Sequence, residues 1–296
     1  MGDGDSDRRG IHPGAKISLE PSRTHDPARP AHEAAAPPEV CTIDVRATQA
    51  RDTAMSDFEG RTIVVTGAAG GIGSAVARMA AGRGARLVLI DPNEAGLESL
   101  ARQLDGGPHV IVPSLLESPS ACEEALSRFE GQIYGLVHMA GIFVPHELEP
   151  AAREVYDRTV AANMTNAFDL VCAMMDRLVS DVPARLVFAS SQAYRRGSLG
   201  HVAYSMAKGG IAGLVRALAR NLRSRALVNG VAPGVIETAM PAHIIAARRD
   251  EMLREIPLGR LGNPEEVAGV VVFLLGPLST YVSGQIINVD GGVNNA

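Results

Sequence analysis

The sequence is poor in three features that mark particular classes of protein: cysteine, long apolar runs and excess positive charge. Its three cysteines lie far apart at positions 41, 122 and 172, without metal-site spacing or the density of a disulfide scaffold, so we expect a reducing, cytoplasmic setting. The longest strongly apolar stretch, residues 268–275, is much shorter than the ~20 residues of a membrane-spanning helix. The formal net charge of −5 gives no general basic excess for binding a phosphate backbone. Neither a membrane nor a nucleic acid is therefore an expected partner.

The first 54 residues also lack aromatic side chains, while they contain six prolines. A segment of this composition buries too little apolar surface to offset the entropy lost on ordering. It has no apolar run for a secretory signal, and its acidic start is unlike a transit peptide. We therefore predict a disordered N-terminal extension over residues 1–54 and a folded domain over residues 55–296.

From Phe58 onward, short apolar segments alternate with amphipathic ones, which is typical of a sheet covered by helices on both faces. The expected strands are 61–66, 86–90, 110–112, 135–139, 185–189, 227–232 and 285–289. The expected helices are 72–83, 94–104, 120–129, 153–179, 203–223, 237–256 and 264–275. The pattern predicts a single α/β domain of the Rossmann type, doubly wound around a seven-stranded parallel sheet.

A glycine-rich segment, TGAAGGIG at residues 66–73, lies between the first expected strand and helix. Gly67, Gly71 and Gly73 have the intervals of a GxxxGxG loop, in which the backbone can approach a pyrophosphate at a helix N-terminus. The alternative is a glycine turn that only packs the helix on the strand.

Asp91 ends the second expected strand, 24 residues after Gly67. This is close to the position where an acidic residue hydrogen-bonds the adenosine ribose in dinucleotide folds. The alternative is a turn or helix-capping aspartate ahead of Pro92.

Tyr204 and Lys208 stand four residues apart on one expected helix, so both emerge on the same face. An ammonium group there favours the phenolate and is predicted to lower the tyrosine pKa into a range useful for proton transfer. Ser191 lies 13 residues earlier, just beyond a strand. Together these three residues predict acid–base chemistry at one oxygen atom.

Because of these motifs, the chain from about residue 55 to 296 resembles a short-chain dehydrogenase/reductase. The matching pieces are the 66–73 loop, Ala140-Gly141, Asn163, Ser191, the Tyr204-x-x-x-Lys208 pair, Asn229, residues 232–234 and the ending 283–292. The resemblance implies a catalytic set of Asn163, Ser191, Tyr204 and Lys208.

The resemblance also implies a set of cofactor-binding residues drawn from the ends of several strands. The set is Gly67, Gly70, Gly71, Ile72, Gly73, Asp91, Ser114, Ala140, Gly141, Tyr204, Lys208, Pro233, Gly234, Ile236 and Thr238. Gly67, Asp91, Gly141 and Ser191 all fall just beyond the carboxyl ends of expected strands, which is the ligand-binding edge of an open α/β sheet.

The sequence departs from the family pattern in two places. His138 and Met139 stand where the family has two asparagines, which puts local sheet hydrogen bonding in doubt; we expect a structural rather than a chemical role for His138. Ser114 stands where the family often has an aspartate that holds the adenine amino group, so we expect a weaker adenine contact.

The resulting hypothesis is reversible hydride transfer between a nicotinamide cofactor and a secondary alcohol or ketone, with Tyr204 as general acid and base. Asp91, with no basic residue in the glycine loop, predicts a preference for NAD over NADP. Two alternatives remain open: a 3-oxoacyl-carrier-protein reductase using NADP(H), and a non-catalytic dinucleotide sensor.

Arg195, Arg196, Arg248 and Arg249 are candidates to meet an anionic substrate or an acidic carrier protein, although exposed arginines are usually only solvated. The apolar surplus of the helices around Asn163 and Tyr204, together with the resemblance, predicts a homotetramer or at least a homodimer.

The N-terminal extension gives the first testable prediction. Because the family resemblance begins near Met55, removing residues 1–54 is expected to leave the melting temperature and the turnover nearly unchanged. Comparing the full chain with residues 55–296 in thermal unfolding and activity assays checks this. A large loss of either quantity would show that the extension docks on the domain.

Overall fold

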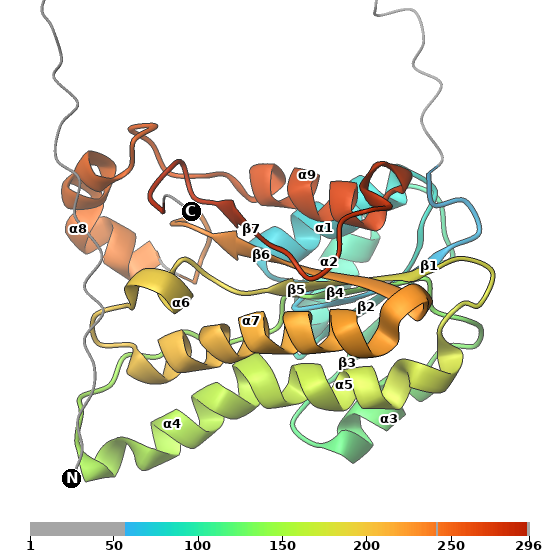
Figure 1. Ribbon diagram of the computed structural model, residues 1–296, viewed down its shortest axis with the longest axis horizontal. Coiled ribbons are helices and arrows are strands. Elements are labelled where there is room, and N and C mark those ends of the chain that lie inside the picture. Colours follow the sequence, from blue (N-terminus) through green and yellow to red (C-terminus); the bar gives the residue numbers. More distant parts are fainter. Residues whose placement is uncertain (1–56, 241, 295–296) are drawn as a thin grey trace, which may run out of the picture. The chain divides into compact units, whose positions relative to one another are not determined.

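The computed structural model describes residues 57–240 and 242–294 of the chain (Figure 1). The predictions made for residues 1–54, and for a domain start at Met55, therefore lie outside the described residues. Within the described part, no helix is both long enough and apolar enough to cross a bilayer.

The core is one seven-stranded sheet in the order β3-β2-β1-β4-β5-β6-β7, and every neighbouring pair is parallel. The strands are β1 (Thr62–Thr66), β2 (Arg86–Asp91), β3 (Val110–Pro113), β4 (Gly135–His138), β5 (Ala184–Ala189), β6 (Ala226–Pro233) and β7 (Ile286–Val289). The central strands are buried on both faces, so they appear in the sequence as continuous apolar runs without alternation. The predicted fold class is confirmed.

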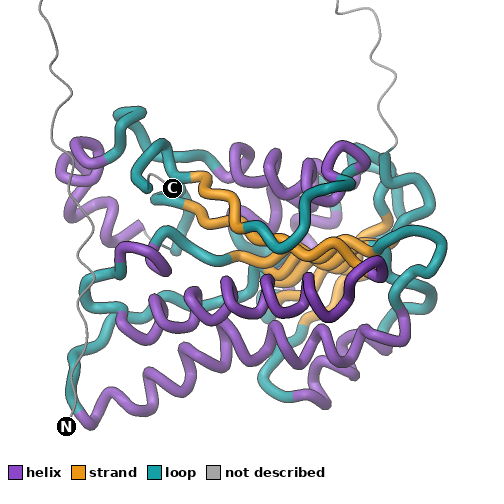
Figure 2. The backbone as a smooth tube through the Cα atoms, viewed as in Figure 1, coloured by secondary structure: helices purple, strands orange, loops and turns teal. Residues whose placement is uncertain are grey.

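Helices cover both faces of this sheet, as Figure 2 shows. One layer holds α1 (Gly71–Ala81), α2 (Glu94–Ala101) and α9 (Pro264–Leu275), whose apolar residues share one core cluster. The opposite layer holds α3 (Pro119–Ser127), α5 (Asn166–Met174) and α7 (Val202–Leu222), which share a second cluster. The two clusters lie on either side of the sheet, because alternate residues of each strand point to opposite faces.

The helix predicted over residues 153–179 is not continuous. It consists of α4 (Arg153–Val160), a π-helical turn (Ala161–Thr165), α5 and a final 3₁₀ turn (Met175–Arg177). The Asn163 side-chain amide donates to the Thr159 carbonyl at 2.9 Å. This contact anchors the Asn163 side chain within the π-helical turn.

Two further departures from the predicted elements follow the carboxyl ends of β5 and β6. A short helix that the sequence did not predict, α6 (Ala193–Arg196), follows β5. The segment predicted as helical over 237–256 is helical only in α8 (Ala242–Glu255), and Arg248 has non-helical dihedral angles within it. Periodicity is weak in both segments, so their conformation is set by tertiary contacts.

Candidate active site

The glycine loop between β1 and α1 is packed too tightly for side chains. Gly67 has a φ of +63°, and a Cβ there would lie 2.8 Å from the Ala140 backbone nitrogen. A Cβ on Gly73 would run into the Gly67 carbonyl oxygen, and one on Gly71 into the Thr238 methyl group. The loop leads directly into the N-terminus of α1, whose first turn carries no acidic residue. This backbone cradle fits the pyrophosphate of a dinucleotide.

Asp91 lies beside that loop at the end of β2. Its carboxylate accepts hydrogen bonds from the backbone N–H of Ala69 at 3.2 Å and of Asn93 at 2.9 Å. The side chain that caps α2 is Asn93, which accepts from Gly96 N–H at 3.0 Å. Asp91 is therefore a turn residue that also borders the glycine loop, whereas it does not cap the helix. Ser114 is half-buried one strand further on, and its N–H donates to the Asp91 carbonyl at 3.3 Å.

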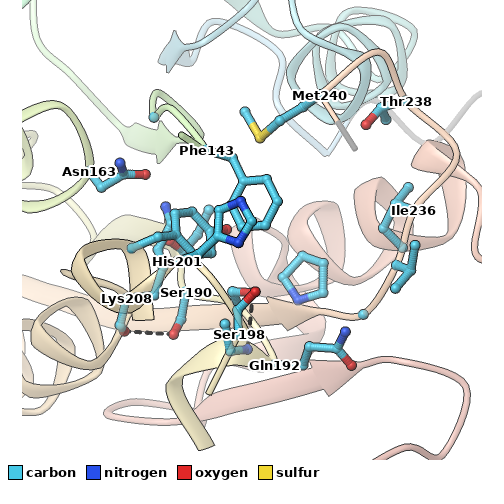
Figure 3. A pocket seen from close by; sticks show the side chains of 18 of the residues that line it. Phe143, Asn163, Ser190, Gln192, Ser198, His201, Lys208, Ile236, Thr238 and Met240 are labelled. Carbon is cyan, nitrogen blue, oxygen red and sulfur yellow. Dashed lines mark hydrogen bonds between the residues drawn. The ribbon is translucent and has the colours of Figure 1, made fainter. Parts of the chain in front are cut away.

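A cavity of about 1080 Å³ extends from the glycine loop across the carboxyl ends of the strands (Figure 3). All four predicted catalytic residues line it. All predicted cofactor-binding residues line it too, with the exception of Asp91, Ser114 and Ala140. Ala140 lies next to the wall, where its N–H donates to the Thr66 hydroxyl at 3.2 Å. The volume suffices for the nicotinamide end of a cofactor together with a small substrate.

The Tyr204 phenol lies between Ser191 and Lys208. Ser191 hydrogen-bonds the phenol, and the Lys208 ammonium nitrogen lies 5.6 Å from the centre of the tyrosine ring. Lys208 is only 3% exposed and donates to the Ala189 carbonyl at the end of β5 at 2.9 Å. The Ser190 hydroxyl returns a hydrogen bond to the Lys208 carbonyl at 2.8 Å (Figure 3). Strand β5 and helix α7 are thus tied together where the three reactive side chains meet.

The pKa of Tyr204 differs in direction from the sequence prediction. Burial raises the pKa of the phenol, and the Ser191 hydrogen bond lowers it by less. Burial also lowers the pKa of Lys208 from 10.5 to about 8. The prediction of a lowered Tyr204 pKa was wrong for this structure, because the cost of desolvating a phenolate exceeds the effect of its neighbours. At neutral pH Tyr204 holds its proton and Lys208 is mostly charged.

Asn163 belongs to the same wall through the π-helical turn. Its amide nitrogen donates to the Ile142 and Thr159 carbonyls, both at 2.9 Å. Its Oδ1 atom is buried and has no hydrogen-bond partner among the described residues. Gly141 faces this oxygen so closely that a Cβ would collide with it. A buried acceptor beside a cavity is a site at which a water molecule or ligand is expected.

His138, the departure at the end of β4, is completely buried. Burial, with a smaller contribution from the Lys208 charge, lowers the pKa of its imidazole to about 3. The ring centre lies 6.1 Å from that of Phe188. The imidazole therefore stays neutral as part of the interior, in agreement with the structural role expected for it.

Asn229, another residue matched by the resemblance, holds the chain before β7. Its side-chain amide donates to the Val282 carbonyl and accepts from the Gln285 N–H.

The cavity-lining side chains that the sequence analysis missed include Phe143, His146, Gln192 and His201. Phe143 stacks on His201 with ring centres 3.8 Å apart and meets Tyr204 edge-on at 4.7 Å (Figure 3). The stack joins two loops more than 50 residues apart, so no local pattern predicts it. The position of Gln192 directly after Ser191 was the one available signal.

The four arginines proposed as anion contacts all have partners. Arg196 pairs with Glu255 at 2.7 Å, Arg248 with Glu251 at 2.6 Å and Arg249 with Glu237 at 3.0 Å. The Arg195 guanidinium donates to the Tyr194 hydroxyl at 2.6 Å. Three of the four charges are therefore offset by a carboxylate, which weakens the case for an anionic substrate or an acidic carrier.

Comparison with known proteins gives the same assignment as this geometry. Residues 67–294 match a family model described as enoyl-(acyl carrier protein) reductase. The chain is 34% identical over 243 residues to the 3-oxoacyl-[acyl-carrier-protein] reductase FabG of Thermotoga maritima, covering 80% of this chain and 98% of the relative. The chain belongs to the short-chain dehydrogenase/reductase family. It is an NAD(P)-dependent oxidoreductase acting on CH–OH groups.

Two solved structures of the family are similar along their whole length. A short-chain dehydrogenase/reductase from Brucella melitensis, named glucose/ribitol dehydrogenase, is 36% identical with a TM-score of 0.75, covering 81% of this chain and 99% of that one. A candidate 2-deoxy-d-gluconate 3-dehydrogenase from Agrobacterium tumefaciens, solved with bound NADP, is 30% identical with a TM-score of 0.72, covering 81% and 98%.

Lys208 gives a prediction that a spectrum can test directly, because the only other lysine in the chain is Lys16. In protein labelled with ¹³C at the lysine ε-carbon, two signals are expected, and the one lost in Lys208→Met is expected to titrate near pH 8. The charged form is the disfavoured one, so the unfolded state binds this proton more tightly. Lys208 alone therefore makes the free energy of unfolding rise between about pH 8 and 10.5. Titration of that signal at an ordinary lysine pKa would contradict the burial argument.

Proposed function

We propose that the protein catalyses reversible hydride transfer between NAD(H) and a secondary alcohol or ketone, with Tyr204 as the general acid and base. The observation that carries this proposal is the meeting of Tyr204, Ser191 and Lys208 in one cavity with the glycine loop. A cavity that holds a proton donor next to a dinucleotide cradle has the parts that carbonyl reduction requires.

In the direction of reduction, Ser191 orients the substrate carbonyl by donating a hydrogen bond to its oxygen. Tyr204 then donates its proton to the same oxygen as negative charge develops there. The raised pKa of the phenol keeps this proton available throughout the neutral range. The nicotinamide dinucleotide, when bound, supplies or accepts the hydride. The glycine loop would hold its pyrophosphate, and Lys208 would hold the nicotinamide ribose.

Asn163 acts through its unpartnered Oδ1 atom, which positions a water molecule beside Lys208. That water carries the proton between the Tyr204–Lys208 pair and solvent. The π-helical turn supports this role, because it turns the Asn163 amide into the cavity wall while keeping its nitrogen on two carbonyls.

A 3-oxoacyl-carrier-protein reductase is the second candidate function, favoured by the name of the FabG relatives. Carrier proteins are recognised through their negative charge, so such a reductase needs free positive charge near the cavity mouth. The pairing of Arg196 and Arg248, which both line the cavity, argues against it. A non-catalytic sensor is disfavoured because dinucleotide binding alone does not require the Ser191–Tyr204 hydrogen bond.

The proposed preference for NAD rests on Asp91 and on what surrounds it. The Asp91 carboxylate contacts the Ala69 N–H at the rim of the glycine loop, so it faces the place where an adenosine ribose would follow the pyrophosphate. A carboxylate accepts hydrogen bonds from ribose hydroxyls, whereas it repels a 2′-phosphate by about a few kcal/mol at an effective dielectric of ~20. The loop residues 68–71 carry no basic side chain to offset that repulsion. The NADP bound to the Agrobacterium relative favours NADP instead. A measured cofactor preference therefore decides between the two cofactors.

We also infer assembly into a homotetramer, or at least a homodimer, in a cytoplasmic setting. Phe168 on α5 and Met206 on α7 are each 54% exposed, although both helices pack on the sheet through their opposite faces. Large apolar side chains left exposed on neighbouring helices are typical of a subunit interface.

The catalytic proposal is tested by Tyr204→Phe, which removes the transferable proton and keeps the ring. Turnover is expected to fall at least ~100-fold, the usual size of general acid–base catalysis. Steady-state kinetics with alcohols and ketones measures this, and dinucleotide affinity from fluorescence titration serves as the control, since it should survive. Retention of most of the activity would refute Tyr204 as the proton donor.

The cofactor proposal is tested by the ratio of kcat/KM for NAD(H) to that for NADP(H). The wild type is expected to favour NAD(H), and Asp91→Ala is expected to shift the ratio toward NADP(H) by about tenfold or more. Asp105→Ala, an acidic residue after α2, is a matched control that should leave the ratio in place. A wild type that favours NADP(H) would make Asp91 a turn residue only.

The assembly proposal is tested by multi-angle light scattering at micromolar concentration. A mass of two or four chains is expected, and Phe168→Asp is expected to lower it, because a carboxylate is costly to bury in an apolar interface. A monomeric wild type would rule the interface out.

A further inference from the structure

Two polar groups on the cavity wall have no role in the mechanism above. The Gln192 Oε1 and His146 Nδ1 atoms are buried, and neither has a hydrogen-bond partner among the described residues. Both residues line the cavity that contains Ser191 and Tyr204. Leaving a buried polar atom unpaired is costly, so such groups in a binding cavity indicate a ligand that completes them.

Gln192 is held close to the reacting centre by its backbone. It follows Ser191 directly, and its N–H donates to the Pro233 carbonyl at the end of β6 at 3.0 Å. The Ser191 hydroxyl in turn accepts from the N–H of Ala193 at 3.2 Å, so Gln192 stands within a tight turn between two anchored neighbours. The Gln192 side chain, labelled in Figure 3, lines the same cavity as the Ser191 hydroxyl.

His146 approaches from the loop after β4. Its backbone N–H donates to the Gly200 carbonyl at 2.9 Å, and its Nε2 atom faces the Ala203 N–H at 3.5 Å. Because Nε2 accepts from a backbone N–H, Nδ1 is the ring nitrogen that can donate a hydrogen bond. The wall therefore offers one unpaired donor from His146 and one unpaired acceptor from Gln192. A hydroxyl group can satisfy both kinds of partner, since it donates one hydrogen bond and accepts others.

The remaining wall defines the charge and shape of the ligand. Arg196 and Arg248 are neutralised by glutamates, so the wall presents no free arginine to a carboxylate or phosphate. Phe143, fixed by its stack on His201, adds a flat apolar surface against Tyr204. These features suit an uncharged, compact molecule with a ring or short carbon frame.

We propose that the substrate is a neutral vicinal diol, oxidised to an α-hydroxy ketone, whose second hydroxyl is bound by Gln192 and His146. This rests on the proposed function. In the reaction, the C–H bond of one carbinol carbon breaks and its hydride passes to the oxidised dinucleotide. The phenol proton of Tyr204 leaves to solvent along the Lys208 and Asn163 water path, the O–H proton of the carbinol takes its place on the Tyr204 oxygen, and the C=O bond forms. The second hydroxyl is unchanged. Products are the α-hydroxy ketone, reduced dinucleotide and one proton.

The test compares cyclohexane-1,2-diol with cyclohexanol, which share a ring and differ in one hydroxyl. The wild type is expected to prefer the diol at least tenfold in kcat/KM. Gln192→Met and His146→Leu keep approximate size and remove the polar atoms, and each is expected to lower this preference about tenfold, the effect of one lost hydrogen bond. Ser198→Ala, which removes another hydroxyl from the cavity wall, is the matched control and should leave the preference in place.

Equal efficiency with the two compounds, no turnover of the diol, or a preference that neither variant alters would overturn the proposal. Tyr204→Phe, measured on the same compounds, separates this failure from that of the proposed function. If the variant loses activity while the wild type ignores the second hydroxyl, only the substrate class is wrong. If the variant stays active, the acid–base assignment itself is wrong.

Discussion

The hydrogen bond from the Lys208 ammonium to the Ala189 carbonyl is the contact on which the site depends. It joins helix α7, which carries Tyr204, to the end of strand β5, just before Ser191. Burying an ammonium group is costly, and the lowered pKa of about 8 expresses that cost. The fold offsets part of this cost by ending β5 beside α7, where the Ala189 carbonyl accepts a hydrogen bond from the ammonium group. A displacement of α7 would move both the tyrosine and the lysine away from the serine.

The fold could be predicted well because its signals are local. Parallel strands buried on both faces leave continuous apolar runs such as residues 185–189, and the loop glycines are required by backbone contacts such as that of Gly67 with Ala140. The π-helical turn at residues 161–165 could not be predicted in this way. A helical periodicity looks the same with or without that turn.

The residues of the site could be predicted from the sequence, whereas the direction of the Tyr204 pKa shift could not. The spacing of Tyr204 and Lys208 places both side chains on one face of a helix, as the structure shows. The direction of the Tyr204 pKa shift depends on burial, which the spacing of residues does not reveal, and here the effect of burial exceeds that of the Ser191 hydrogen bond. The Phe143–His201 stack and the ion pair of Arg196 with Glu255 join segments far apart in the sequence. Such contacts decide what the cavity binds, so the reaction type could be predicted before the substrate.

The scarcity of lysine has a practical consequence for handling the protein. Lys208 is one of only two lysines in the sequence and is 3% exposed. Burial therefore shields its ammonium group from bulky amine-directed reagents in the folded protein. Coupling the protein to an activated resin or a fluorophore ester is expected to spare the ammonium group beside Tyr204.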